Sequence, residues 1–513
     1  MSGAHQFEND TYGVGTRLKS PPSPELLDFF QQVYLDGVDE AYFDDSIAVS
    51  LAHVVMLAET EIIPAADAAQ ILAELLTVGE GGLASFPLDR TLGDPLPNLE
   101  NHLIGRLGAR VGGRFHTGRS RGDYYVALSR LKFRRLCLLL MERAAQFRAT
   151  VLDIAKTGVL AVMPGYTHLQ HAQPITLAHY LLATVQQLER DHERLRAAFE
   201  RINKSPLGLG IIATSSFPLD RKLTARLLGF TDLLDNGRDL VDRDYVLELT
   251  SAAAILMMHL HKLATDLYEW TTAEFGYVRV ADEDAMTSSM MPQKANPVLL
   301  ELVRARTGLV YGGMTAAFTI AKGSAANNIE ASLTDAPAAQ AVKETIRTLT
   351  GFTPMLGRIT FDRGRMARLA GEHWSQATDL ADLLVRDTGI SFREAHRVVG
   401  HLVATTLEKS VSPSEVSTNL LDEAAEAVLG RPLSVPADRL AAVLDPAAGV
   451  SGRALKGGPA PAVVEPALKS AARRLTQDRS ELNRLAAMLA QRRRELTRVA
   501  GSLVAKASSG TRP

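Results

Sequence analysis

The longest strongly apolar helical pattern in the chain is "VLELTSAAAILMMHLHKLATDLYEW", which runs from Val246 to Trp270. Apolar residues would lie almost all the way around a helix formed by this stretch. A helix on a protein surface carries its apolar residues on one side, whereas a helix that is apolar all round is covered by its neighbours. The stretch therefore predicts a central helix that is buried on all sides.

Long segments without proline surround this stretch, and they allow long helices because proline breaks a helix interior. Four such segments are Asn98–Met163, Ile175–Ser205, Leu219–Met291 and Val298–Ala336. Within the first segment, four leucines would lie near one helix face, with the arginines largely elsewhere: Leu131, Leu136, Leu138 and Leu139, against Arg134, Arg135 and Arg143. Alternation typical of strands is scarce, so we expect an all-α protein with a bundle of unusually long helices.

The composition is that of an ordinary globular protein, with 46% hydrophobic and 22% charged residues. Lys and Arg number 56 against 58 Asp and Glu, and this near balance argues against a protein built mainly to bind nucleic acid. The single cysteine, Cys137, lies in an apolar stretch, which predicts a core thiol in a reducing compartment. The first residues, "MSGAHQFENDTYG", do not resemble a signal peptide, and apolar runs are too short to span a membrane. We expect a soluble cytoplasmic protein.

The composition changes near residue 360, where the helices become shorter and the loops more frequent. We expect an N-terminal helical domain over 1–118, a central long-helix bundle over 119–365, a small helical domain over 366–462 and a basic helical tail over 463–513. The tail should pack on the bundle or on a neighbouring subunit; contact with a membrane or a nucleic acid is the alternative.

Two patterns resemble cofactor motifs without their context. "GLGIIA", Gly208–Ala213, has the glycine spacing of a dinucleotide site, but a predicted helix precedes it where that site needs a strand. His259 and His261 are two residues apart in a predicted helix, so their side chains point to different faces and cannot share a metal. The sequence makes no case for a metal or an organic cofactor.

Three polar turns stand out between the helical segments. They are the first turn, "HTGRSRGDYY" (His116–Tyr125), the second, "MPGYTHLQHAQP" (Met163–Pro174), and the third, "TSSMMPQKANP" (Thr287–Pro297). Each carries hydroxyls with a cationic or imidazole group, and such turns can direct backbone N–H groups at an anion. Each alone could be an ordinary capped turn. The third is the most specific, because Ser288, Lys294 and Asn296 surround a fixed bend at Pro292.

Together the turns resemble the three motifs of the fumarase/aspartase superfamily, the first two in their argininosuccinate lyase form. The resemblance extends from about Tyr12 to Pro461, through "SSFPLDR", "ATDLADLLV", "FREAH", "LDP" and "GGPAP". It implies a three-domain all-α fold whose central long-helix bundles form a twenty-helix core in a tetramer. It also implies that each active site of this homotetramer collects the three turns from three different subunits.

Members of this family split an N-substituted aspartate into fumarate and a free amine. A proton must leave the carbon beside a carboxylate, so the developing negative charge needs preorganised donors, and the amine must leave protonated. The resemblance implies Ser288 and His168 as the catalytic pair, with Ser288 as the base. Lys294 and Asn296 would stabilise the developing charge, and Thr167 would hold a substrate carboxylate. The other predicted substrate contacts are Ser120, Arg121, Ser289 and Gln173.

The chain differs from the argininosuccinate lyase pattern at several positions. The asparagine and the glutamine that usually continue the first turn are replaced by Gly122 and Tyr124. The other departures fall where the family grips the amine half or approaches the site from the N-terminal region: Asn328, Leu333, Ala336, Gln32 and Leu96.

Groups that serve fumarate chemistry therefore remain, while groups that hold the arginine end do not. We expect a carbon–nitrogen lyase that reversibly eliminates fumarate from an N-substituted aspartate, with an amine other than arginine. A genuine argininosuccinate lyase with unusual contacts is the first alternative. A catalytically silent structural relative, as the lens crystallins of this family are, is the second.

Overall fold

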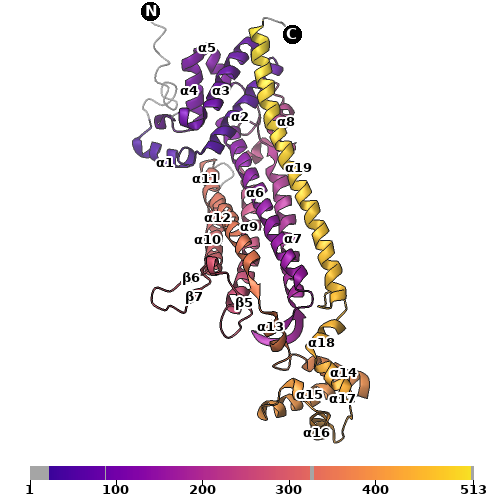
Figure 1. The fold of residues 1–513 in the computed structure, drawn as a ribbon. Helices are drawn as coiled ribbons and strands as arrows, with labels where there is room; N and C mark the ends of the chain where they lie inside the picture. The colour runs from indigo at the N-terminus through magenta and orange to yellow at the C-terminus, as the bar shows by residue number, and fades with distance from the viewer. Residues whose placement is uncertain (1–21, 87, 324–327, 510–513) are drawn as a thin grey trace, which may run out of the picture.

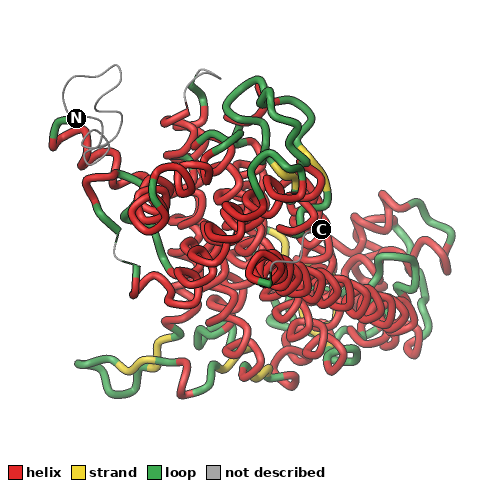
Figure 2. The backbone as a smooth tube through the Cα atoms, turned by 90° about the horizontal axis from the view of Figure 1, so that it is seen from above, coloured by secondary structure: helices red, strands yellow, loops and turns green. Residues whose placement is uncertain are grey.

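The computed structural model describes residues 22–86, 88–323 and 328–509. Within these residues the regular structure is overwhelmingly helical, so the prediction of an all-α protein is confirmed. Figure 1 shows an elongated molecule with the N-terminal helices at one end, long helices in the middle and a small helical group at the other end. The same arrangement seen from above in Figure 2 consists almost entirely of packed helices.

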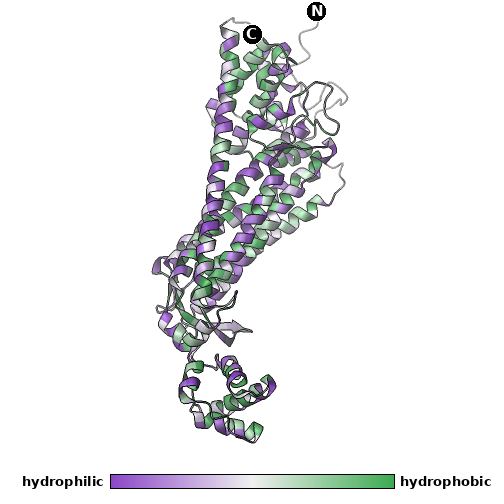
Figure 3. Cartoon of the chain, turned by 90° about the vertical axis from the view of Figure 1, so that its right-hand side faces the viewer, coloured by the Kyte–Doolittle hydropathy of each residue, from purple (hydrophilic) through white to green (hydrophobic). Residues whose placement is uncertain are grey.

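Five long helices form the central bundle. They are α6 (Arg121–Thr157), α7 (Leu177–Ile202), α9 (Asp244–Trp270), α10 (Val298–Ala321) and α12 (Asp335–Arg358). Neighbouring helices contact one another around the bundle, and one apolar core runs through all five. Figure 3 shows hydrophobic and hydrophilic residues alternating along these helices, as amphipathic packing requires.

The stretch Val246–Trp270 forms most of α9, in contact with α7, α10 and α12. Its residues are buried except along one side, where Ser251, Ile255 and Met258 are half-buried. The predicted burial on all sides is therefore met on most of the helix circumference within one chain. Cys137 of α6 lies in the same core, where burial raises the pKa of its thiol and its Sγ donates to the Leu195 carbonyl (3.4 Å), as a core thiol should.

One detail of the predicted α6 face is wrong. Arg134 is buried, and its guanidinium donates to Asn203 Oδ1 (2.9 Å) and to the Leu228 carbonyl (3.0 Å). Leu136 and Leu138, which were predicted to lie on the apolar face, are only half-buried. Since α6 is covered on several sides, its buried face is wider than one stripe and includes an arginine whose polar atoms have partners.

The N-terminal helices form a second apolar cluster around the start of α6. They are α1 (Pro24–Tyr34), α2 (Glu40–Glu59), α3 (Ala65–Ser85), α4 (Pro95–Leu107), α5 (Ala109–Gly112) and, later in the chain, α8 (Arg221–Leu228). The core of this cluster includes Phe43, Leu72 and Leu99, whereas α1 has no buried residue and lies on the surface. The helices bring the first turn against this cluster.

The C-terminal helices form a third, smaller apolar cluster. After α11 (Asn328–Leu333) and α13 (Arg363–Ala370) come α14 (Ala377–Thr388), α15 (Phe392–Glu408), α16 (Thr418–Leu429), α17 (Ala437–Leu444) and α18 (Pro446–Gly452). Their shared core includes Leu384, Leu402 and Leu421. The domain limits expected from the sequence stay a prediction.

The last helix, α19 (Pro461–Ser508), is 48 residues long and runs back along the whole bundle to the N-terminal helices (Figure 1). Leu468, Leu475 and Leu482 join the core of the bundle, whereas Leu496 and Ala500 join the N-terminal cluster. The basic tail of the sequence therefore forms a long helix that packs on the core of the bundle and on the N-terminal cluster.

Short strands and 3-10 turns occupy the ends of the helices. The strands pair as β1 (Val162–Thr167) with β2 (Gln170–Thr176), β3 (Lys204–Ser205) with β4 (Asp232–Leu233), β5 (Val278–Arg279) with β8 (Thr360–Phe361), and β6 (Met286–Thr287) with β7 (Ala295–Asn296). All pairs are antiparallel except β3 with β4. The 3-10 turns are η1 (Arg90–Leu92), η2 (Gly113–His116), η3 (Gly237–Val241), η4 (Asp282–Asp284) and η5 (Pro413–Glu415).

Among the described residues, two helices, α2 and α9, are long and apolar enough to cross a membrane by length and composition alone, so the expectation that every apolar run is too short is wrong. In the folded chain 72% and 61% of their apolar windows are buried inside the protein. Both behave as core helices, which is compatible with the predicted soluble protein.

Candidate active site

The first turn leads into the N-terminus of α6, and its polar residues fix that helix end. Ser120 is the N-cap: its hydroxyl accepts the Gly122 N–H (3.1 Å), and Asp123 accepts the Ser120 N–H in return (3.1 Å). This reciprocal pair is a capping box, which stabilises the exposed N–H groups of the first helical turn. The polar turn is thus placed before a buried helix partly for structural reasons.

The two arginines of the first turn lie in different surroundings. Arg119 is buried, with its guanidinium over the Phe115 ring at 4.1 Å from the centroid. Arg121 is exposed, and its Nη1 lies 3.4 Å from Oδ2 of the buried Asp94. Of the two, only Arg121 is exposed to solvent; its role as a substrate contact stays a prediction.

A cavity of about 280 Å³, here called the first-turn cavity, lies beside this helix end. It brings together three parts of the chain that the sequence singled out separately: the first turn, the N-terminal region and α11. Its lining residues are Phe30, Tyr34, Asp94, Ser120, Arg121, Gly122, Tyr125, Val126, Ile211, Arg243, Ile329 and Ser332.

Polar groups in the first-turn cavity are bound to one another. The Tyr125 hydroxyl donates to Asp94, and burial raises the pKa of Tyr125 so that it remains a donor. The Tyr34 hydroxyl lies 3.4 Å from Ser332 Oγ. The cavity therefore has a hydrogen-bonded polar side formed from α1, α4, α6 and α11.

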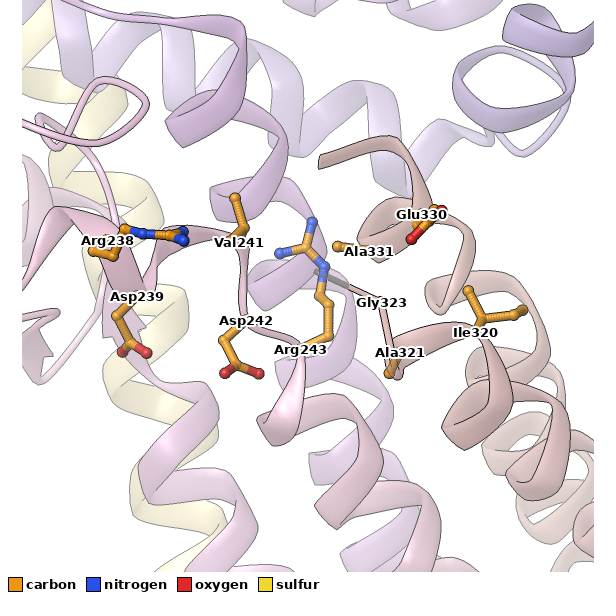
Figure 4. Close-up of a pocket in the computed structure, with 10 residues that line it drawn as sticks. All are labelled: Arg238, Asp239, Val241, Asp242, Arg243, Ile320, Ala321, Gly323, Glu330 and Ala331. Carbon is orange, nitrogen blue, oxygen red and sulfur yellow. The ribbon is translucent and has the colours of Figure 1, made fainter. Parts of the chain in front are cut away.

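Arg243 connects this cavity to a neighbouring pocket, drawn in Figure 4. The pocket lies between η3, the end of α10 and α11, and the Arg243 guanidinium is directed toward Val241 and Ala331. Arg243 is buried, and its Nε lies 3.5 Å from Asp335 Oδ1. A buried cation with an anionic partner gives this end of the bundle a fixed charge arrangement.

The second turn is the tip of the β1–β2 hairpin. His168 and Leu169 both have left-handed backbone conformations, with φ of 56° and 57°, and Thr167 pairs with Gln170 on either side of them. Two left-handed residues in a two-residue loop are typical of a type I′ hairpin turn. Gly165 lies at an irregularity of β1, where a Cβ would come within 2.7 Å of the Gln173 carbonyl. The hairpin thus projects Thr167 and His168 from a closely paired base.

A second cavity, of about 740 Å³, lies between this hairpin and the end of α9. Thr167, His168 and Gln173 all line it, so the structure brings these three predicted residues together. On the α9 side, Tyr180 donates to Asp266, a carboxyl whose pKa burial raises.

The third turn is the loop between β6 and β7. The Ser288 hydroxyl accepts two backbone N–H groups, from Met290 (3.2 Å) and Met291 (3.0 Å). Ser289 and Lys294 are exposed, and Asn296 is half-buried in β7. The loop therefore presents its four predicted residues on an exposed strand pair, with the serine oxygen already facing two amides.

The three turns do not meet within one chain. The first and second turns lie at opposite ends of α6, whose 37 residues span about 55 Å at the rise of an α-helix. Figure 1 shows the β6–β7 loop projecting sideways from the bundle, away from the β1–β2 hairpin at its lower end, and Figure 2 shows it standing clear of the helices. A site that contains all three turns must combine several chains.

The residues that depart from the argininosuccinate lyase pattern lie in different surroundings. Tyr124 is fully buried and its hydroxyl bonds to Ser46 of α2, so it faces the core, and the neighbouring Tyr125 lines the cavity instead. Leu96 is also fully buried. Gln32 is exposed on α1 and donates to Asp28 (2.9 Å), outside the lining of the first-turn cavity.

Leu333 and Ala336 are exposed at the junction of α11 and α12, and the side chain of Asn328 lies outside what the structure describes. Tyr34, Tyr125, Ile211 and Arg243 are cavity residues that sequence reasoning missed. Tyr125 lies in the first turn and Ile211 in "GLGIIA", so the sequence gave a positional signal for these two, whereas Tyr34 and Arg243 had none. Among the described residues, no group of three or more His, Cys, Asp and Glu is placed to hold a metal.

Two sequence families match the chain. Residues 29–312 match the family described as lyase, and residues 374–451 match the argininosuccinate lyase C-terminal family. The argininosuccinate lyase of Methanococcoides burtonii is 37% identical over 485 residues, which cover 92% of this chain and 94% of that protein. That of Methanothermobacter thermautotrophicus is also 37% identical, covering 88% and 96%.

Solved structures give the same relationship. EDDS lyase in complex with formate superposes with a TM-score of 0.85 at 32% identity, covering 96% of this chain and 98% of that one. Class II fumarase from Schistosoma mansoni, at 15% identity and a TM-score of 0.65, shares the fold alone. The chain therefore belongs to the argininosuccinate lyase family of carbon–nitrogen lyases, within the fumarase/aspartase superfamily.

Proposed function

We propose that this lyase reversibly eliminates fumarate from an N-substituted aspartate with Ser288 as the base. The observation that carries the proposal is the pair of N–H groups that the Ser288 oxygen accepts. A serine hydroxyl is a very weak base, and its alkoxide needs fixed donors that are already in place. Two loop amides and the nearby Lys294 provide such donors.

The remaining predicted residues are assigned to the other steps of the reaction. As the proton leaves carbon, the electron pair forms the double bond of fumarate and the C–N bond breaks; the nitrogen then takes a proton, which we assign to His168. Thr167, Ser289 and Asn296 would hold the substrate carboxylates. Gln173, Ser120 and Arg121 would complete the substrate contacts.

We further propose that the active enzyme is a homotetramer whose sites each combine turns from three subunits. The separation of the turns along α6 supports shared sites. The exposed side of α10 supports assembly, because it carries Leu302 and Leu309 along one edge and Tyr311 and Phe318 along the other, all exposed in the single chain. Large apolar side chains left exposed on one helix are typical of an interface.

The amine half is proposed to be other than arginine. Relatives at 37% identity are named argininosuccinate lyases, and a relative at 32% identity is an EDDS lyase, so the amine differs within this range of similarity. A variant of the latter is described with bound fumarate, which supports the shared half of the reaction. Near the first turn, Gly122 has no side chain to bind a polar amine, and Leu333 is apolar. We place the reaction in the cytoplasm.

The test is to incubate the protein with fumarate and a panel of amines, and separately with argininosuccinate, while following fumarate absorbance. We expect fumarate consumption with an amine other than arginine and slow turnover of argininosuccinate. Fast turnover of argininosuccinate would instead identify a genuine argininosuccinate lyase. Lack of turnover with every compound would favour a silent relative.

Ser288→Ala should lower kcat by about a thousandfold, because the variant has no oxygen to accept the proton. Ser451→Ala, on the exposed side of α18, is the matched control and should keep the parental rate. Equal activity of the two variants would contradict the assignment of the base.

A further inference from the structure

The side chain of Ile211 fills the space beside Gly122, which has no side chain of its own. A Cβ at this position would lie 2.4 Å from Cδ1 of Ile211 and 3.5 Å from Cδ2 of Leu240. The first contact is far shorter than van der Waals distance, so any side chain at position 122 would have to displace Ile211. Ile211 therefore occupies the space that a longer residue on α6 would use.

The backbone that carries Ile211 is tied to the same helix end. Oδ2 of Asp123 accepts the N–H groups of Gly208 (3.0 Å) and Gly210 (3.1 Å), and both glycines have left-handed conformations, with φ of 83° and 62°. Ile211 follows directly. The "GLGIIA" stretch, which has no strand-and-helix context for a nucleotide, thus has a structural role: it sets one wall of the first-turn cavity.

Several apolar side chains line the first-turn cavity together with Ile211. Tyr34 lies between two other aromatic rings, with centroid distances of 4.6 Å to Tyr125 and 4.8 Å to Phe30. Ile329 of α11 lines the same cavity. The polar lining residues contact one another or Asp335 and form the other side of the cavity, so only the part of a ligand that faces Ile211 meets mainly rings and branched hydrocarbon.

We propose that Ile211, in the space left by Gly122, is a specificity-determining residue that selects an amine with an aromatic or branched apolar body. This inference rests on the proposed fumarate chemistry and names the class of amine for it. An apolar wall disfavours a ligand whose polar groups would lie against it and lose their hydrogen-bond partners on entry. Arginine is such a ligand.

The experiment measures addition of amines to fumarate by the parent protein and two variants. The amines with an apolar body are 2-phenylethylamine, cyclohexylamine and isobutylamine. The amines with charged groups besides the reacting nitrogen, here called the charged amines, are arginine and lysine. Ile211→Ala should raise the KM for the preferred apolar amine about tenfold or more and leave the KM for fumarate unchanged. Ile212→Ala is the matched control, because Ile212 is 53% exposed against 41% for Ile211 but is not among the residues that line the cavity.

Two further variants keep the test independent of folding. Ile211→Val should give an intermediate KM, and Gly122→Asn combined with Ile211→Ala should turn over the charged amines better than Gly122→Asn alone, because the shortened side chain makes room for the asparagine. Equal KM values for Ile211→Ala and Ile212→Ala, or a parent that prefers the charged amines, would overturn the inference. Absence of fumarate consumption with all amines would instead refute the proposed function itself.

Discussion

At the residue scale, one carboxylate organises the predicted substrate end of the chain. Asp123 is fully buried and accepts N–H groups from Ser120, Gly208 and Gly210. Burial nevertheless raises its pKa to about 6, since the loss of water outweighs these hydrogen bonds. The folded protein thus holds a proton on Asp123 more tightly than the unfolded chain does.

This difference predicts a pH dependence of stability. Because the folded pKa of Asp123 is raised from 3.8, its contribution to the free energy of unfolding is fully present below about pH 4 and is lost as the pH rises through about 6. Asp123→Asn should remove this loss, on the order of 2 kcal/mol between pH 4 and 7. Urea unfolding at both pH values measures it, and Asp153→Asn, on the exposed side of α6, should keep the parental slope.

The sequence predicted the motif residues of the three turns but not their neighbours. Ser288, His168 and Thr167 were predicted because the turns that contain them resemble motifs of the family. The roles of Tyr125 and Ile211 were not predicted, because these side chains line the cavity only through packing of segments distant in the chain. The sequence also drew attention to Tyr124, which local composition could not distinguish from Tyr125 although Tyr124 bonds to Ser46 in the core and Tyr125 lines the cavity.

At the element scale, α19 depends on a buried ion pair. The guanidinium of Arg148 on α6, only 2% exposed, bonds to Asp478 of α19, and His192 of α7 lies 3.6 Å from the same carboxylate. Three helices therefore meet at one charged contact beside the apolar core of the bundle.

Asp478→Asn should destabilise the protein by about 3 kcal/mol, because it leaves the charge of Arg148 buried without an anion. Arg474→Ala is the control on the same helix, since Arg474 pairs with Glu189 at 2.8 Å but is itself exposed; it should cost less than about 1 kcal/mol. Thermal or urea unfolding distinguishes the two. A similar loss in both variants would mean that the Arg148 pair is no more important than a surface pair.

Helices were predicted well here for a physical reason, and their faces less well. Absence of proline and recurrence of apolar residues are local signals that determine where a long helix can form. Which side is buried depends on how many neighbours the helix has, which the sequence does not encode locally. Arg134 is the example: it is charged, yet buried, because Asn203 and the Leu228 carbonyl lie within reach.

At the scale of the whole molecule, the length of α6 determines what one chain can do. It holds the first-turn cavity and the His168 hairpin at opposite ends of the bundle. The exposed side of α10, which includes Leu309, is proposed to meet other copies of the chain.

Leu309→Glu should therefore prevent assembly and abolish activity together, because a charge on the exposed side of α10 would be buried in the proposed tetramer. Leu407→Glu is a matched control: Leu407 is 66% exposed on α15, against 60% for Leu309 on α10. Light scattering after size-exclusion chromatography measures the mass of each variant. A tetramer in both cases would place the subunit interface elsewhere.

Mixed assemblies test whether sites are shared. Ser288→Ala and His168→Asn subunits should each be inactive alone, whereas co-expressed they should regain activity in up to about a quarter of the sites, where both intact turns come from different chains. Assemblies in which every site is built from one chain would stay inactive. Fumarate absorbance per milligram of purified mixture gives the result.

The backbone at the tip of the β1–β2 hairpin has an evolutionary consequence. Asn-Gly suits two successive left-handed positions, whereas His168 and Leu169 adopt them at a local cost of about 1 kcal/mol each. Selection for thermostability in the laboratory should therefore favour His168→Asn or Leu169→Gly at this tip. If His168 serves the chemistry, such selection would trade turnover for robustness, and the hairpin would be the first place where the two demands conflict.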